Sequence, residues 1–327
     1  MHSLSKTVVS PDTAQAIIAA AFGSGSRVRA FEELKDGYFN AAYAITLADG
    51  LRCVLKVAPP DAVRVLRYER DILAAEVAVM RLVRQYTELP VPAILGYDTS
   101  RRLVESDFYL MAFIEGAPLN KVRKELSPDE QHAVDREIGR YLRQMNEIAG
   151  PAFGYFSHPA PPGYSWRETF VAMLDGVLAD GQDGLRPGVA LPLAYAALRE
   201  RVAVAATILD DVTAPRLVHW DLWDGNIFVD PATKRVNGII DFERALWGDP
   251  LMEATFVFAP PEGLAAFTEG YGQALLDTPA QARRRILYNI YLYLIMIIEC
   301  AYRQYETHDQ ENWARGRLAG ELARLEN

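Results

Sequence analysis

The residue pattern changes at Gly116-Ala117-Pro118, and this change constrains the fold more than any other feature of the chain. Before it, apolar stretches typical of strands surround one long amphipathic helix, and an Asp49-Gly50 turn indicates a hairpin between two of them. After it, helical periodicity dominates. We therefore expect an α+β, two-lobed protein with a small antiparallel-sheet lobe over residues 1–113 and a larger, mainly helical lobe over residues 114–327.

Within the first lobe, Ser10 and Pro11 predict the start of a helix that runs to about residue 21. Strands are expected over 28–34, 38–47, 52–57, 93–95 and 108–114, with a helix over 63–85. In the second lobe, Ser127 and Glu130 form a capping box that opens a helix to about residue 148. Further helices are expected over 166–178, over 191–209 and from 250 onward, with short strands over 227–229 and 236–240.

Composition excludes several classes of function. The 327 residues carry a net charge of −9, which argues against binding nucleic acid. The two cysteines, Cys53 and Cys300, show no metal-ligand spacing and favour a reducing compartment. The first residues lack the apolar core of a signal peptide, and the apolar run over 290–298 is half the length that crosses a bilayer. We expect a cytoplasmic protein with no membrane, nucleic-acid or protein partner.

Three oxygen-bearing side chains follow one another near the ends of two predicted strands. Asp221 and Asn226 stand five residues apart on a loop, because Asp224-Gly225 interrupts any helix there. Asp241 follows the next strand, fifteen residues beyond Asn226. Mg²⁺ prefers oxygen ligands and is usually held by one or two carboxylates together with substrate phosphates. These three residues therefore predict a magnesium site.

A lysine and a glutamate in the first lobe complete the set. Lys56 lies in a predicted strand, where it can hold phosphate oxygens, and the following helix offers Glu69 or Glu76 to fix it. A strand lysine, a helix glutamate, an H-x-D-x-x-x-x-N loop and a strand-end aspartate occur in the same order in phosphoryl-transfer enzymes of the kinase type.

The chain resembles the aminoglycoside phosphotransferase family, whose relatives include choline, fructosamine and homoserine kinases and which has the protein-kinase-like fold. The resemblance covers nearly the whole chain. It is sharpest in the run from Val218 to Ile227, VHWDLWDGNI, which is similar to the family's V-H-G-D-L-x-x-x-N pattern. The runs IDFE from Ile240 and GDP from Gly248, and LPVP from Leu89, also match family patterns, and the last favours Glu76 over Glu69.

The resemblance implies ATP and Mg²⁺ as cofactors. It implies that Asp221 orients and deprotonates a hydroxyl, that Asn226 and Asp241 hold Mg²⁺, and that Lys56, fixed by Glu76, clamps the α- and β-phosphates. Adenine would lie between the lobes against backbone near Met111 and Phe113. His219 is expected to orient the loop rather than carry a proton.

Two features depart from the family pattern. Trp220 stands where the family has glycine between the loop histidine and aspartate, and its indole could shape the acceptor site. The expected nucleotide-covering loop, residues 36–43, contains Gly37 as its only glycine.

We therefore expect an ATP-dependent kinase that transfers the γ-phosphoryl group to a hydroxyl of a small molecule. The alternatives are a catalytically silent nucleotide-binding scaffold and a protein kinase, although the activation segment of protein kinases is missing. Residues 116–327 carry −8 of the net charge, which favours an amino-bearing acceptor such as an aminoglycoside. Acidic candidates for that surface are Asp241, Glu243, Glu253 and Glu299, while Trp166, Trp220, Trp223, Trp247 and Tyr293 would suit a more apolar alcohol or a quaternary ammonium.

Overall fold

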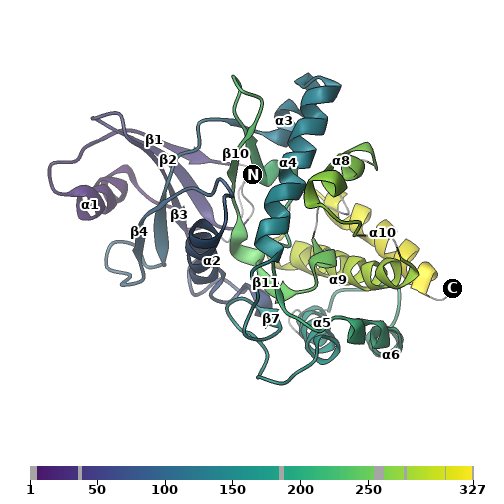
Figure 1. Ribbon diagram of the computed structural model, residues 1–327. Coiled ribbons are helices and arrows are strands. Elements are labelled where there is room, and N and C mark those ends of the chain that lie inside the picture. Colours follow the sequence, from purple (N-terminus) through teal and green to yellow (C-terminus); the bar gives the residue numbers. More distant parts are fainter. Residues whose placement is uncertain are drawn as a thin grey trace.

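A five-stranded antiparallel sheet forms the first lobe of the computed structural model, which describes residues 6–35, 39–183, 188–253, 261–275, 278–305 and 307–325 (Figure 1). The strand order is β1-β2-β3-β5-β4. The strands are β1 (Val28–Leu34), β2 (Ala41–Leu47), β3 (Arg52–Val57), β4 (Ile94–Asp98) and β5 (Phe108–Ala112). The division expected after residue 113 falls immediately past β5, where the chain leaves the sheet.

The two faces of this sheet serve different purposes. Because side chains alternate along a strand, Cys53, Leu55 and Val57 of β3 pack toward α1 (Pro11–Phe22). Val54 lies on the opposite face, in the core that it shares with α2 (Ile72–Tyr86) and the second lobe. In Figure 1 the sheet lies between α1 and α2, and α2 stands on the side of the second lobe. Lys56 has the same parity as Val54, so the alternation directs it toward α2.

Helices and two small three-stranded sheets build the second lobe. The helices are α3 (Leu119–Val122), α4 (Pro128–Asn146), α5 (Trp166–Asp183), α6 (Tyr195–Ala205), α8 (Pro261–Tyr271), α9 (Pro279–Arg303) and α10 (Asp309–Leu325). The sheets are ordered β10-β9-β6 and β7-β11-β8, with β6 (Ala117–Pro118), β7 (Gly154–Tyr155), β8 (Arg216–Val218), β9 (Ile227–Val229), β10 (Val236–Ile239) and β11 (Leu246–Gly248). This α+β, two-lobed architecture confirms the expected fold class.

Helix α9 is the central element of the second core. Its length and composition would let it cross a membrane, but 83% of its most apolar window is buried inside the protein. The long apolar run is therefore accounted for by core packing. Thr278 caps α9 by accepting the Gln281 backbone N–H at 3.2 Å, and Ser127 caps α4 in the same way at 3.3 Å.

The helix expected over residues 63–85 is too long at its start, because α2 begins only at Ile72. The preceding residues 58–71, here named the connector, follow an irregular path from the end of β3 with a single 3-10 turn at Arg67–Glu69. Pro59 and Pro60 cannot donate helix hydrogen bonds, and Asp71 has a φ of 57°. Buried contacts between this turn and the second lobe replace the helical bonds, which periodicity alone could not reveal.

Other boundaries differ by a few residues. The helix expected over 191–209 is α6 followed by a 3-10 segment, Ala206–Asp211. The strand expected over 108–114 ends at Ala112. Strands of two or three residues, such as β7 and β11, were not expected, because so short a segment shows no periodicity. Residues 36–38 of the expected nucleotide-covering loop lie outside the described residues, and its last three residues belong to β2.

Candidate active site

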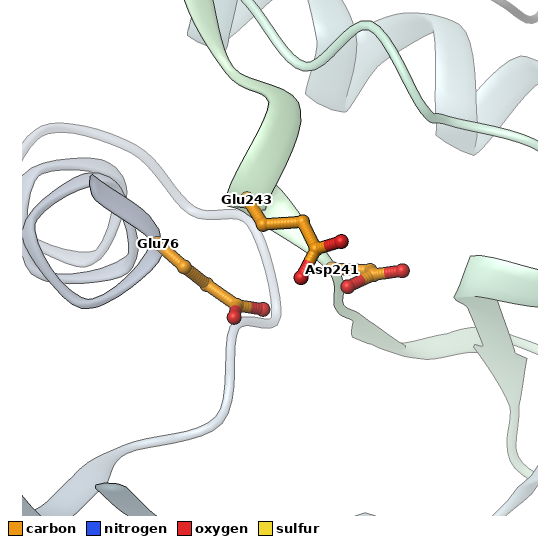
Figure 2. A group of neighbouring side chains, drawn as sticks. All are labelled: Glu76, Asp241 and Glu243. Atoms are coloured by element: carbon orange, nitrogen blue, oxygen red, sulfur yellow. The ribbon is translucent and has the colours of Figure 1, made fainter. Parts of the chain in front are cut away.

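Lys56 lies at the centre of three carboxylates that come from both lobes. Its Nζ is 2.8 Å from Oε2 of Glu76 on α2, 2.6 Å from Oδ1 of Asp241 and 3.1 Å from Oε2 of Glu243. Figure 2 shows the three acidic side chains turned toward one another, with Glu76 on one lobe and the other two on the segment after β10. Asn40, the residue before β2, donates to Glu243 Oε2 at 2.5 Å.

The charges of this cluster do not balance. Burial acts to lower the pKa of Lys56, but Asp241, Glu243 and Glu76 outweigh it and hold this pKa well above its usual value. Burial raises the pKa of Glu76 to about 8 despite the attraction of Lys56. Glu76 therefore holds a proton near neutral pH, and Lys56 faces the two further carboxylates of Asp241 and Glu243, whose excess negative charge suits a divalent cation that binds beside them.

The loop after β8 is held by hydrogen bonds from its own histidine. His219 is fully buried, its Nε2 donates to the Ile240 carbonyl at 3.0 Å, and its Nδ1 accepts the Asp221 backbone N–H at 3.2 Å. Burial lowers its pKa to about 4. The ring is therefore neutral near pH 7 and positions the loop against the strand that carries Asp241.

Asp221 and Asn226 face each other across this loop. The Asn226 side-chain amide donates to the Asp221 carbonyl at 2.8 Å and to its carboxylate Oδ2 at 3.3 Å. This arrangement consumes the amide protons of Asn226 and leaves Oδ1 as the atom that could ligate a metal. Burial raises the pKa of Asp221 to about 7, with Arg244 acting in the opposite direction. A carboxylate that titrates near neutrality suits general-base work.

Trp220 occupies a conformation that bulky residues rarely adopt. Its φ is 63°, in the left-handed region where glycine is favoured. The strain is held by surrounding contacts. Glu253 Oε1 and Oε2 accept the backbone N–H groups of His219 and Trp220 at 2.9 and 3.1 Å, and the indole stacks on Tyr291 with centroids 5.2 Å apart. The side chain of Trp220 is 1% exposed and therefore belongs to the core beneath Asp221.

The connector closes over the same core. Tyr68 lies edge-on to Trp220 with ring centroids 6.2 Å apart, and stacks on Tyr155 at 5.9 Å. Its neighbour Glu69 binds Arg303 of α9, with 2.5 Å between Oε1 and Nη2. The first-lobe connector is therefore anchored in the second lobe beside the loop that carries Asp221.

The expected site residues fall into three groups. Lys56, Glu76 and Asp241 are in direct contact, and Asp221 contacts Asn226. Glu69, the alternative to Glu76, pairs with Arg303 instead. Met111 and Phe113 lie where β5 leaves the sheet, and the Phe113 backbone N–H already donates to Arg52 at 3.3 Å. Their contact with adenine stays a prediction.

Sequence reasoning missed Glu243 as a part of the lysine cluster. It considered this residue only as a surface acid for the acceptor, although Glu243 stands in the same IDFE run as Asp241. A strand-end carboxylate followed two residues later by a second one was the available signal. Arg244, the next residue, was also missed. It donates to Glu299 at 2.9 Å and its charge acts on Asp221.

Most residues that were considered for an acceptor surface make contacts inside the protein. Glu253 is fully buried against backbone N–H groups, and Glu299 is 3% exposed and paired with Arg244 and Arg303. Four of the five aromatic side chains that were considered are buried, and Trp223 alone among these five is exposed, at 37%. Most residues that were candidates for an acidic or an aromatic acceptor surface are therefore buried or already paired.

The chain belongs to the phosphotransferase enzyme family, whose model matches residues 30–287. The whole fold is shared with solved structures of kinases for small molecules. A thermostable mutant of the aminoglycoside phosphotransferase APH(4)-Ia, in a complex with AMP-PNP and hygromycin B, matches with a TM-score of 0.67 and 19% identity over 95% of this chain and 98% of that one. A putative fructosamine-3-kinase from Haemophilus somnus matches with a TM-score of 0.65 and 17% identity over 95% and 97%.

Curated relatives match over smaller shares of their length. A probable acyl-CoA dehydrogenase from Arabidopsis thaliana is 23% identical over 232 residues, which cover 67% of this chain and 26% of that protein. A subtelomeric cluster protein from Aspergillus fumigatus is 28% identical over 127 residues, 38% of this chain and 24% of that protein. The chain thus spans about a quarter of the length of these relatives.

The residues present fit a magnesium ion. One ligand oxygen from each of Glu76, Asp241 and Glu243 lies within 4.8 Å of the others. All three offer carboxylate oxygens, the donor type that Mg²⁺ prefers.

Proposed function

We propose that the protein is an ATP-dependent phosphotransferase that moves the γ-phosphoryl group to a hydroxyl of a small molecule. The observation that carries this proposal is the contact of Lys56 with both Glu76 and Asp241, which joins the two lobes at a point near Asp221. Nucleotide would bind between the lobe of residues 1–113 and the lobe of residues 114–327. Membership of the phosphotransferase family supports the reaction class.

Each charged residue would have one task. Lys56 would hold α- and β-phosphate oxygens and exchange its bond with Asp241 for bonds to nucleotide, while Glu76 keeps the ammonium in place. Asp241 and the Oδ1 atom of Asn226 would hold Mg²⁺, with Glu243 as a further carboxylate within reach. When bound, the ion would neutralise charge that develops on the β- and γ-phosphate oxygens.

Asp221 would position the acceptor hydroxyl and receive its proton. The hydroxyl oxygen forms a bond to the γ-phosphorus, the bond between that phosphorus and the β–γ bridging oxygen breaks, and ADP departs with the electron pair. The proton resides on the Asp221 carboxylate until it passes to solvent. Most of the rate enhancement would come from alignment and charge neutralisation, because phosphoryl transfer involves little covalent work by the protein.

The acceptor is defined less sharply than the donor. The expected preference for an amino-bearing hydroxyl compound rested on net charge and on four carboxylates. Glu253 and Glu299 are committed to internal contacts, and Glu243 and Asp241 contact Lys56. The charge argument therefore has little support from the described side chains, and the proposal keeps only a small molecule that bears a hydroxyl.

ADP release from Mg-ATP, with and without candidate acceptors, tests this function. We expect Mg-ATP to raise the melting temperature by mass action, and the wild type to release ADP slowly without acceptor. Asp241→Ala should abolish both effects because it removes a metal ligand and a lysine contact. If the wild type neither binds Mg-ATP nor releases ADP, the protein is not a kinase and the silent scaffold is the better description. Labelled ATP with generic protein substrates tests the protein-kinase alternative.

A further inference from the structure

A cavity of about 550 Å³ lies beneath the connector, in the size range of ligand sites. Its wall is formed by residues of the connector, the start of α2, the two residues before β2, Arg101 and Asp107 between β4 and β5, and Asp180 and Tyr302 of the second lobe. Asn40 belongs to this wall and also donates to Glu243. The cavity therefore shares a side chain with the lysine cluster.

Most of the charges on this wall are already paired. Arg101 binds Asp61 and Asp107, Glu69 binds Arg303, and Asp180 binds Arg67. Asp71 lies 3.3 Å from the ring of His158. Each carboxylate on the wall thus has a basic partner among the described residues.

Two arginines on the wall have no such partner. Arg64, Arg67 and Arg70 follow one another at intervals of three residues in the connector, and all three line the cavity. Arg67 is committed to Asp180, while neither Arg64 nor Arg70 forms an ion pair within 4 Å among the described residues, and the charge of Arg70 also acts on Asp180. The Arg64 guanidinium lies 5.9 Å from the ring centroid of Tyr302, another residue of the wall. Three guanidinium groups therefore lie around Asp180 and Tyr302. Glu69 is already paired with Arg303 outside the wall, whereas Asp180 is paired with Arg67 of the wall itself.

The same segment reaches the catalytic loop. Tyr68 stands between Arg67 and Glu69 in the chain, and its ring packs against Trp220, the residue before Asp221. Asn40 contributes a further polar atom, because its Oδ1 is buried without a hydrogen-bond partner among the described residues. The cavity is therefore linked to the lysine cluster through Asn40, and the connector that covers it is linked through Tyr68 to the residue before Asp221.

We propose that the cavity binds an anionic group of the acceptor, a carboxylate or a phosphate, through Arg64 and Arg70. Guanidinium groups bind both anions with paired hydrogen bonds, and two uncommitted ones on one wall supply charge that the anion would neutralise. The inference rests on the proposed function, because the acceptor is the second substrate of that phosphotransferase. It replaces the cationic acceptor that net charge suggested. The acceptor would then be a hydroxyl compound that carries a carboxylate or a phosphate ester.

The test compares the double variant R64Q/R70Q with the matched control R29Q/R81Q. All four arginines are exposed and without a described ion pair, so both variants lose two positive charges and should fold. Inorganic phosphate is titrated calorimetrically into each protein that is saturated with a non-hydrolysable ATP analogue. We expect phosphate affinity to fall at least fivefold in R64Q/R70Q and to stay unchanged in the control. Equal affinity in all three proteins would overturn the proposal.

A second arm uses acceptors that differ in charge alone. Coupled ADP release is measured with glycerol, 3-aminopropane-1,2-diol, glycerate and glycerol 3-phosphate, and the last two distinguish carboxylate from phosphate. We expect an anionic member to give the highest kcat/KM, and R64Q/R70Q to raise its KM at least tenfold with kcat and acceptor-free ADP release unchanged. If a neutral or cationic compound gives the highest kcat/KM, and R64Q/R70Q leaves that value unchanged, the inference is overturned. The proposed kinase function would then still stand. If the wild type releases no more ADP than Asp241→Ala does, the proposed function is wrong. The phosphate titration would still decide whether the cavity binds an anion.

Discussion

The two halves of the candidate site differ in the interactions that hold them together. The side that would hold nucleotide is a cluster of charges, in which Lys56 meets three carboxylates within 3.1 Å. The side beneath Asp221 is a layer of packed rings, with Trp220 between Tyr68 and Tyr291. The charged half depends on residue type and fixed spacing, whereas the aromatic half depends on how neighbouring segments pack. Variants in the first half should therefore change rate, and variants in the second should change stability.

Asp221→Ala should have the largest effect, since it removes the base from the point where the two halves meet. With a true acceptor we expect kcat to fall by about 10²–10⁴-fold, the usual contribution of general-base catalysis. Binding of Mg-ATP, measured by calorimetry, should stay within twofold of the wild type because Lys56 and Asp241 are intact. Asp221→Asn serves as the isosteric control, and near-normal turnover of either variant would show that another group takes the proton.

Glu76→Gln should have the next largest effect and would test the charged half alone. Lys56 would keep Asp241 and Glu243 as partners but lose the fixed carboxylate on α2. We expect kcat/KM for ATP to fall by about 10²-fold, the lower end of the loss on removing one electrostatic stabiliser. Glu69→Gln is the matched control on the neighbouring segment, because Glu69 binds Arg303 and should affect melting temperature rather than ATP use. Equal effects of the two variants would contradict the assignment of Glu76.

Trp220→Gly should reveal the energetics of the aromatic half. Removing a buried indole costs about 3–5 kcal/mol, while relief of the positive φ returns about 1–3 kcal/mol. A net loss of stability is therefore expected, seen as a lower midpoint in urea. Trp220→Phe keeps most of the stacking on Tyr291 and should fall between the two. A Gly variant that is more stable than the wild type would show that strain exceeds packing at this position.

The same contrast explains how much the sequence could predict. The spacing of Asp221, Asn226 and Asp241 depends on local strand ends. Asn226 contacts Asp221, and the backbone N–H of Ile240, the residue before Asp241, donates to the Asn226 carbonyl at 3.1 Å. The α+β division also follows from periodicity. The connector could not be predicted in this way, because Tyr68 and Glu69 leave the helical pattern to make contacts with residues more than 150 positions away. Glu243 was hidden for a related reason, since its partner Lys56 lies on the other lobe.

The smallest expected effect is the pH dependence of turnover, and it joins the two halves through Asp221. Burial raises the pKa of this carboxyl to about 7, so the ionised form that can accept a proton is lost as the pH falls through neutrality. With Mg-ATP saturating, log kcat/KM for the acceptor should rise by about one per pH unit below 7 and level off above it. His219 should not contribute, because burial lowers its pKa to about 4 and the ring stays neutral across this range.

Arg244 provides the test of that assignment. Its positive charge opposes the effect of burial on Asp221, so Arg244→Gln should raise the pKa of Asp221 further and move the midpoint of the profile to higher pH. The paired carboxylate Glu299 keeps Arg303 as a partner, and circular dichroism would verify that the variant is folded. An unchanged midpoint in a folded Arg244→Gln variant would mean that the profile reports a different group, such as the acceptor itself.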